Sequence, residues 1–163
     1  TERRAATFAL RASEARARGV EREAIESKAL MQAFFDHAEA MIYIKDREGR
    51  YLAVNRAFER ALSLNSADVL GRRDADLFPE EMAKQFRQTD EIVMREERAL
   101  AYEVESTLAG ARGVFWSVKF PIRDARGEVA AACGISTDIT ARKRIERDLE
   151  AAKNAAEANA RRA

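Results

Sequence analysis

The chain of 163 residues is long enough for one compact domain with short additions. Its 29 Lys and Arg residues against 28 Asp and Glu residues leave a net charge of +1, which argues against a nucleic-acid partner, because phosphate neutralisation needs surplus cations. One Cys and one His exclude an internal disulfide and a Cys-rich zinc site, and leave no spare members for a Ser-His-Asp or Cys-His set.

Helix-breaking residues are almost confined to the middle of the chain. Both Pro residues and six of the seven Gly residues lie between positions 49 and 134. The two ends consist mainly of Ala, Arg, Glu and Lys, which are strong helix formers. The sequence therefore predicts an N-terminal signalling helix over residues 1–35, a globular domain over residues 36–140 and a C-terminal linker helix over residues 141–163. Since no initiator Met is present, we expect a piece of a longer protein.

Both predicted end helices carry apolar or small residues whose spacing alternates between three and four, as the seam of a coiled coil requires. In the N-terminal helix the seam consists of Leu10, Ala17, Val20, Ala24, Met31 and Phe34, with Ser13 and Ser27 between them. In the C-terminal helix it consists of Ile145, Leu149, Ala152 and Ala156. We expect a homodimer joined through its flanking helices. The alternative is a single amphipathic helix that packs on its own domain.

The globular part opens with a predicted hairpin and continues into a group of helices. Two β-rich runs, over residues 41–45 and 51–54, flank a turn that contains Gly49. Asn55 fits the N-cap of a short helix that follows it. Two short turns come next, and Pro79 then begins a longer helix with Glu residues in its first turn.

Three longer strands complete the globular part, each with apolar and polar residues in alternation. We expect them near residues 102–108, 116–122 and 129–139, with hairpin turns at 109–113 and 124–127. Two strands, a group of helices and a three-strand meander make an α+β fold. The predicted architecture is a five-stranded antiparallel sheet with short helices on one face.

Several short motifs, in this order and spacing, resemble the PAS (Per-Arnt-Sim) sensor domain over roughly residues 35–140. The motifs are Ile44-Lys45-Asp46 with Gly49-Arg50, Val54-Asn55-Arg56-Ala57-Phe58, Leu70-Gly71-Arg72 ahead of Asp76-Leu77-Phe78-Pro79, Lys119-Phe120-Pro121-Ile122, Asp124 with Gly127, and Asp138-Ile139-Thr140. The last of them leads straight into a charged helix. The resemblance implies the PAS fold between N- and C-terminal coiled-coil helices.

Residues 151–159 are similar to the linker before the dimerisation and phosphoacceptor helices of bacterial sensor histidine kinases. The resemblance implies a two-component sensor, with an output kinase domain in cis and a phosphorelay to a response regulator through the parent protein. We expect a cytoplasmic domain whose parent could be anchored in the inner membrane. Two alternatives stay open: a PAS module that regulates a diguanylate cyclase or phosphodiesterase, and a ligand-free dimerisation domain.

The candidate chemical residues do not predict an enzyme within this chain, because no nucleophile–base pair, phosphate-binding Gly loop or metal-ligand spacing is present. Haem-binding relatives use a His on the longer helix, and residues 79–97 contain none. Light-sensing relatives use a Cys among the short helices, whereas Cys133 lies in the last strand. A small-molecule ligand or non-covalent FAD stays open.

Three isolated groups receive structural interpretations, with alternatives. Cys133 is a packed small hydrophobe or, if it is exposed with a lowered pKa, a redox sensor. His37 is interpreted as a packed or capping residue rather than a ligand. We expect no metal site, because helix capping accounts for Asp74 and the acidic residues that follow it.

Two sets of residues are candidates for the site. The resemblance assigns signal coupling to Asp138, Ile139 and Thr140, where the last strand meets the output helix, although the residues themselves predict only a helix cap. A change in sheet packing would then alter the angle or register of that helix. Strand parity and helix faces give the candidate pocket residues Ile44, Val54, Phe58, Leu62, Phe78, Phe86, Tyr102, Val104, Trp116, Val118, Phe120, Cys133 and Ile135.

Overall fold

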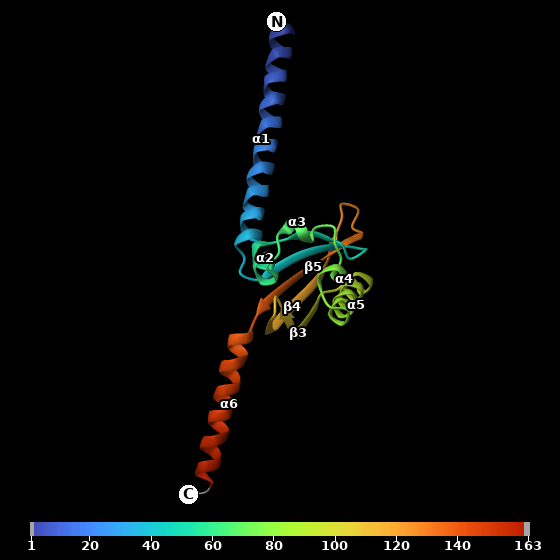
Figure 1. Ribbon diagram of the computed structural model, residues 1–163. Helices are drawn as coiled ribbons and strands as arrows, with labels where there is room; N and C mark the ends of the chain where they lie inside the picture. The colour runs from blue at the N-terminus through green and yellow to red at the C-terminus, as the bar shows by residue number, and fades with distance from the viewer. Residues whose placement is uncertain (1, 162–163) are drawn as a thin grey trace. The chain divides into compact units, whose positions relative to one another are not determined.

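The computed structural model describes residues 2–161, so the outermost residues of both predicted end helices, residue 1 and residues 162–163, lie outside the described part. The chain divides into two units, Thr1–His37 and Ala38–Ala163. The first unit is the helix α1 (Glu2–His37), and the second holds the sheet and the remaining helices (Figure 1).

The second unit is built on a five-stranded antiparallel sheet, as predicted. Its strands are β1 (Met41–Asp46), β2 (Tyr51–Val54), β3 (Leu100–Leu108), β4 (Ala111–Arg123) and β5 (Val129–Asp138). They pair in the order β2-β1-β5-β4-β3, and every neighbouring pair is antiparallel. The last strand therefore lies in the centre of the sheet, between the first hairpin and the other two strands of the meander.

Four helices connect β2 to β3, and a fifth follows β5. They are α2 (Arg56–Leu62), α3 (Ser66–Val69), α4 (Asp74–Leu77), α5 (Glu80–Glu96) and α6 (Thr140–Ala160). The buried Asn55 begins α2 as predicted, because its Oδ1 accepts from the Phe58 N–H at 3.0 Å. The same oxygen accepts from the Ile42 N–H at 2.9 Å, so one side chain fixes α2 to β1.

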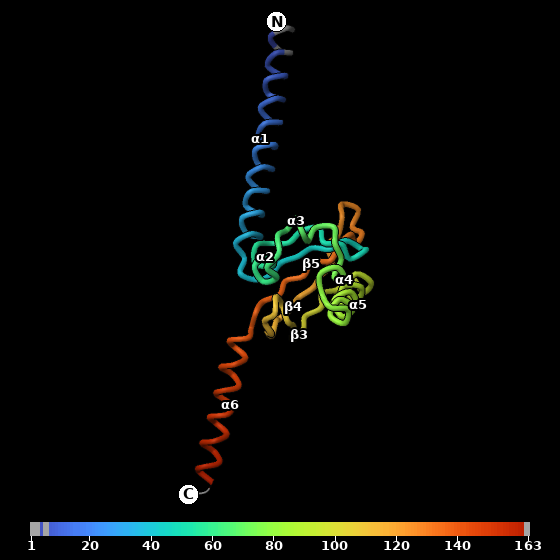
Figure 2. The backbone as a smooth tube through the Cα atoms, viewed as in Figure 1, coloured from blue at the N-terminus to red at the C-terminus, as the bar shows by residue number. Residues whose placement is uncertain are grey.

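The β3–β4 hairpin differs from the expected turn over residues 109–113. Figure 2 shows the backbone of β3 and β4 on neighbouring paths in the sheet. Only Ala109 and Gly110 separate the two strands, and their φ angles are positive, at 48° and 83°. Positive φ at both central residues suits the two-residue turns whose twist matches that of paired strands. Gly113 lies within β4 and pairs with Ser106. The predicted turn was too long because Gly113 was interpreted as a turn residue.

The two faces of the sheet differ in what covers them. On β4, Phe115, Ser117 and Lys119 point to the inner face, where α2, α4 and α5 lie, and all three are buried. On β1, the Tyr43 ring lies across Gly134 of β5, where an added Cβ would overlap with the ring. Gly134 is therefore required by this close approach, and its neighbour in the pair, Tyr43, can enter the core.

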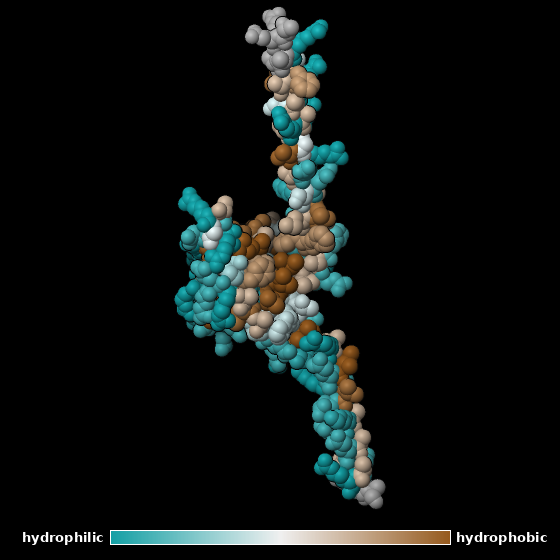
Figure 3. Space-filling view, turned by 180° about the vertical axis from the view of Figure 1, so that it is seen from behind, coloured by the Kyte–Doolittle hydropathy of each residue, from teal (hydrophilic) through white to brown (hydrophobic). Residues whose placement is uncertain are grey.

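Both flanking helices expose apolar side chains. The exposed large side chains of α1 are Phe8, Leu10, Val20, Ile25, Leu30, Met31 and Phe34, and those of α6 are Ile145 and Leu149. Figure 3 shows apolar side chains along one side of α6. The sequence seam includes six of these residues and omits Phe8, Ile25 and Leu30. Among residues 2–161, no helix is at once long and apolar enough to cross a bilayer.

Candidate functional site

A small cavity of about 40 Å³ lies between the inner face of the sheet and the helices. Six of the predicted pocket residues line it: Phe58, Leu62, Phe78, Phe86, Tyr102 and Val104. Its polar wall consists of Tyr43, Lys45, Ser106, Ser117 and Ser136, and Ser117 and Ser136 share a hydrogen bond of 2.8 Å. This volume holds about three water molecules.

The other predicted pocket residues do not line the cavity. Ile44, Trp116, Val118, Phe120, Cys133 and Ile135 lie on the opposite, outer face of the sheet, where cross-strand pairs such as Ile44–Cys133 and Val118–Ile135 place them together. Val54 is buried in the core beside the cavity. The parity interpretation was wrong for β4 and β5 because the inner face is partly polar there, while the outer face is apolar. An apolar patch is visible on this unit in Figure 3.

Two lysines and two aspartates occupy the interior next to the cavity. The exposed fractions of Lys45, Lys119, Asp74 and Asp90 are 1%, 1%, 4% and 1%. Lys45 Nζ donates to both carboxylate oxygens of Asp74, at 2.7 and 2.6 Å, and to Asp90 Oδ2 at 2.9 Å. Lys119 Nζ donates to Asp90 Oδ1 at 2.5 Å. The four side chains form one neutral network, here called the charge network, that joins β1 and β4 to α4 and α5.

Further hydrogen bonds complete the charge network. Lys119 Nζ also donates to Thr89 Oγ1 at 2.8 Å and to the Phe86 carbonyl at 3.1 Å. The Tyr51 hydroxyl donates to Asp74 Oδ1 at 2.6 Å. Each ammonium group thus has three acceptors, which matches its three donors. Because the interior charges already satisfy one another, they leave no free counter-charge for a charged ligand.

Burial and neighbouring carboxylates shift the pKa values around the network. Burial holds the pKa of Lys119 below its usual range, although Asp90 acts in the opposite direction. Burial and Asp74 raise the pKa of Tyr51 well above 10, and burial with Asp90 does the same for Tyr43. Burial also raises the pKa of Tyr102. The aromatic rings stabilise the cations in turn, since Lys45 Nζ lies 4.8 Å from the centre of the Tyr51 ring.

The charge network was not predicted, and Asp74 was assigned a role as a helix cap. That assignment was wrong, because the Asp74 carboxylate points inward to Lys45 rather than to the N-terminus of α4. A signal was present in the sequence: Asp90 falls on the same side of α5 as Phe86 and Val93, and Lys119 shares the parity of Phe115 on β4. Charged residues at core positions predict pairing.

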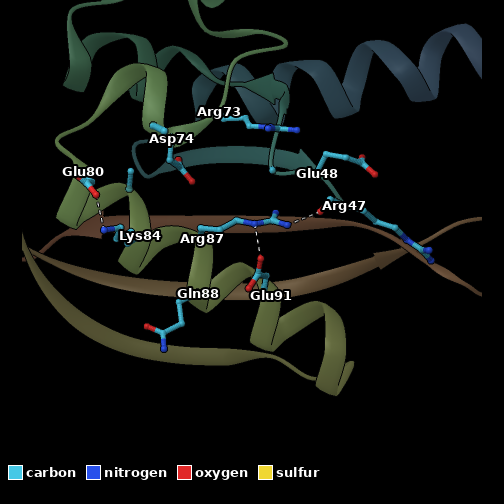
Figure 4. A pocket seen from close by; sticks show the side chains of 12 residues that line it. Arg47, Glu48, Arg73, Asp74, Glu80, Lys84, Arg87, Gln88 and Glu91 are labelled. Atoms are coloured by element: carbon cyan, nitrogen blue, oxygen red, sulfur yellow. Dashed lines mark hydrogen bonds and ion pairs between the residues drawn. The ribbon is translucent and has the colours of Figure 1, made fainter.

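A larger groove of about 820 Å³ opens on the far side of Asp74, between α4, α5 and the β1–β2 turn (Figure 4). Arg87 lies at its centre, where Nε contacts Glu91 Oε1 at 2.7 Å and Nη2 donates to the Arg47 carbonyl at 3.0 Å. Lys84 pairs with Glu80 along α5. The groove carries both signs of charge in similar number, so it does not select an anion or a cation. Asp74 borders the groove and, through its bond to Lys45, the cavity.

The three residues assigned to signal coupling join β5 to α6. The Thr140 N–H donates to Asp138 Oδ1 at 2.8 Å, and Ile139 is buried. Both backbone groups of Val114 on β4 are bonded to the start of α6. The Val114 N–H donates to Thr140 Oγ1, and the Val114 carbonyl accepts from the Ile139 N–H, each at 2.9 Å. One turn further, Lys143 pairs with Glu103 of β3 at 2.9 Å. The helix α6, which follows β5 in the chain, is therefore also fixed to β4 and β3.

Two isolated residues take no part in either region. Cys133 is buried on the outer face, and burial raises the pKa of its thiol to about 11. This thiol is protonated at neutral pH and is a poor redox sensor. His37 is the exposed last residue of α1.

The family model described as the PAS fold matches residues 35–144, and the chain belongs to this family. Its sequence is 38% identical over 114 residues to the methanogenesis regulatory histidine kinase FilI of Methanothrix harundinacea, which covers 70% of this chain and 13% of that protein. It is 30% identical over 103 residues to a diguanylate cyclase of Vibrio cholerae, covering 61% of this chain and 32% of that protein.

A solved structure supports the same assignment. The PAS domain of BvgS from Bordetella pertussis superimposes with a TM-score of 0.61 at 25% sequence identity, covering 80% of this chain and 98% of that chain. The present chain spans less than a third of the length of the two relatives above. It is therefore a PAS sensor domain with relatives among histidine kinases.

Loss of one carboxylate from the charge network should cost far more stability than loss of an exposed one. Asp90→Asn leaves two buried ammonium groups with one carboxylate, so we expect a decrease of about 3–5 kcal/mol in the free energy of unfolding, measured by urea titration. The control, Glu80→Gln, breaks an exposed pair with Lys84 and should cost less than about 1 kcal/mol. Similar losses for the two variants would contradict the network's role.

Alkaline unfolding should coincide with ionisation of the tyrosines. In the folded state the pKa of all three tyrosines is raised, so the tyrosines of the unfolded chain ionise at a lower pH than those of the folded chain. The free energy of unfolding is therefore unaffected by these groups below pH 10 and falls as the pH rises further. The lowered pKa of Lys119 has the opposite effect, because it makes the free energy of unfolding rise with pH up to about pH 10.5. Lys119 is one group against three tyrosines, so the loss prevails. We expect phenolate absorbance and loss of circular dichroism to rise together. Ionisation of the tyrosines near pH 10 in a folded chain would refute this.

Proposed function

We propose that this chain is the sensing and relay domain of a two-component sensor histidine kinase, and that it passes a signal through Asp138, Ile139 and Thr140 to α6. The observation that carries the proposal is the attachment of α6 to both backbone groups of Val114. A helix held by a neighbouring strand must follow that strand when the sheet changes its packing. In the proposal, α6 then leads to a kinase domain in cis, which transfers phosphate to a response regulator.

The second element of the proposal is a homodimer formed through the flanking helices. Leu10, Val20, Met31 and Phe34 of α1 are exposed in the single chain, as are Ile145 and Leu149 of α6. Pairing of two copies would remove these side chains from water at a gain of about 25 cal/mol for each Å² of apolar surface. Two α6 helices attached to two sheets would then tilt or rotate together.

The third element concerns the signal. The cavity of about 40 Å³ is far smaller than the several hundred Å³ of typical ligand sites, so haem or FAD would require the helices to move apart. We infer that the cavity responds to a small uncharged molecule that forms hydrogen bonds with the Ser and Tyr hydroxyls of its wall, or that the signal arrives mechanically through α1. In this proposal the domain itself catalyses no reaction. The domain lies in the cytoplasm, and its parent protein is anchored in the inner membrane.

A second candidate output is a diguanylate cyclase, since one relative at 30% identity carries that name. The relay would be the same, and only the domain after α6 would differ. The kinase is preferred because the relative with the higher identity, at 38%, is a histidine kinase.

Substitution at the junction should change the output of the full-length protein without unfolding the domain. Thr140→Ala removes the acceptor of the Val114 N–H at a cost of about 1 kcal/mol, so we expect autophosphorylation to shift by about fivefold in either direction. Thr140→Ser keeps the hydroxyl and should keep most of the native response. The matched control is Thr137→Ala, since Thr137 is an exposed residue of β5 three positions earlier in the chain.

The result is decided by comparing the three variants at equal stability. Equal kinase output from Thr140→Ala, Thr140→Ser and the native protein, with and without stimulus, would refute the relay. Synthesis of cyclic diguanylate in place of autophosphorylation would refute the kinase assignment and support the second candidate. A monomer in solution would refute the dimeric part.

A further inference from the structure

Gly113 of β4 lies next to both Phe115, which lines the cavity, and Thr140 at the start of α6. A Cβ added to this glycine would lie 3.0 Å from Phe115 Cε2 and 3.0 Å from Thr140 Oγ1. Phe115 is 7% exposed and lines the cavity, while Thr140 begins α6. Because Gly113 has no side chain, the space beside it is available to the Phe115 ring and the Thr140 hydroxyl.

The need for glycine here is one of space rather than of backbone conformation. Gly49, Gly71, Gly110 and Gly127 have positive φ angles, which favour glycine, and Gly113 does not. Both contacts at Gly113 are closer than side-chain atoms usually approach a Cβ, so a methyl group would force a neighbour to move by a few tenths of an ångström. The neighbours are a core ring and a hydroxyl with a bonding partner, and neither can move without consequence.

We propose that Gly113 is a positioning residue of the relay: the space beside it accommodates both the Phe115 ring and the Thr140 hydroxyl, so that displacement of the ring in the cavity wall moves the first turn of α6. The inference rests on the proposed function and names the contact through which it operates. A ring pushed toward Gly113 displaces Thr140 Oγ1 and lengthens its 2.9 Å bond from the Val114 N–H. A ring that moves away leaves this bond intact.

The next link along α6 to the sheet is weaker. The Lys143–Glu103 pair has side chains that are 26% and 42% exposed, and pairs of this kind contribute little to stability. The Ile139 N–H stays bonded to the Val114 carbonyl at 2.9 Å, and Ile139 is buried. Loss of the Val114–Thr140 bond would therefore loosen the first turn of α6 beyond Ile139. The space at Gly113 adjoins the Val114–Thr140 bond, because Val114 follows Gly113 in the chain. A displacement at Gly113 therefore acts on this bond.

Amide hydrogen exchange of the present chain tests the inference directly. Gly113→Ala should speed exchange at Val114 and at the first amides of α6 by about five- to tenfold, since a lost hydrogen bond changes the opening equilibrium by about that factor. The control is Gly19→Ala, because nothing lies within 4 Å of the added Cβ there. Unchanged exchange at Val114 in a folded Gly113→Ala chain would overturn the inference.

A second variant decides the outcome if Gly113→Ala does not fold. In Gly113→Ala/Phe115→Leu the smaller side chain vacates the space that the new methyl group enters. We expect this double variant to fold and to exchange at Val114 within about twofold of Phe115→Leu alone. Failure of the double variant to fold, or exchange at Val114 more than about fivefold faster than in Phe115→Leu alone, would show that the Phe115 ring does not occupy this space and would overturn the inference.

The inference and the proposed function fail in different ways. If Thr140→Ala changes kinase output and Gly113→Ala does not, the relay stands and Gly113 has no part in it. If neither substitution changes the output, the relay itself is refuted. If Gly113→Ala changes both the Val114 exchange and the output, with Gly19→Ala silent in both, the inference is supported.

Discussion

The pairing of two buried lysines with two buried aspartates is the constraint on which this domain depends. A lone charge of this kind would be costly in the interior, so Lys45 and Lys119 on the sheet require Asp74 of α4 and Asp90 of α5 opposite them. The helices consequently lie close to the inner face, and the cavity between them is small. The tyrosines and Phe86 that surround the network complete the enclosure and raise the cost of any rearrangement.

The same arrangement separates the charge network from the attachment point of α6. The charge network fixes α4 and α5 over one end of the inner face, whereas Phe115, Gly113 and Val114 lie at the other end, beside the start of α6. The first region is held by ionic hydrogen bonds. The second is held by close packing and by two hydrogen bonds of the Val114 backbone, one with the Thr140 hydroxyl and one with the Ile139 N–H. Small displacements are therefore easier at the second region, which is the one connected to α6.

The sequence predicted the architecture well because its signals were local. Alternating strands, the Asn55 cap and the Pro-free, Ala- and Glu-rich ends each specify their own element, and the order of those elements specifies the antiparallel sheet. The face of each strand was harder to predict: Trp116, Val118 and Phe120 form the apolar parity of β4, yet they lie on the outer face. Burial of Ser117 and Lys119 depends on partners from other elements, and strand parity contains no information on them.

The site was predicted in part for the same reason. Asp138 and Thr140 stand in a contiguous motif, so their position at the junction followed from the chain itself. The roles of Asp74 and Gly113 depend on residues 29 and 27 positions away in the chain, Lys45 and Thr140, and only the folded structure brings them together. A charged residue on an apolar helix face and a glycine inside a strand were the available signals.

The central claim is that α6 is a rigid continuation of the sheet and is paired with the α6 of a second copy. Its most direct test is the distance between two spin labels on Ala155→Cys in the dimer, since the buried Cys133 with its raised pKa should resist labelling. The account predicts one narrow distance in the native chain and a shifted or broadened distribution in Thr140→Ala. No distance between copies, or the same distribution in both proteins, would contradict it.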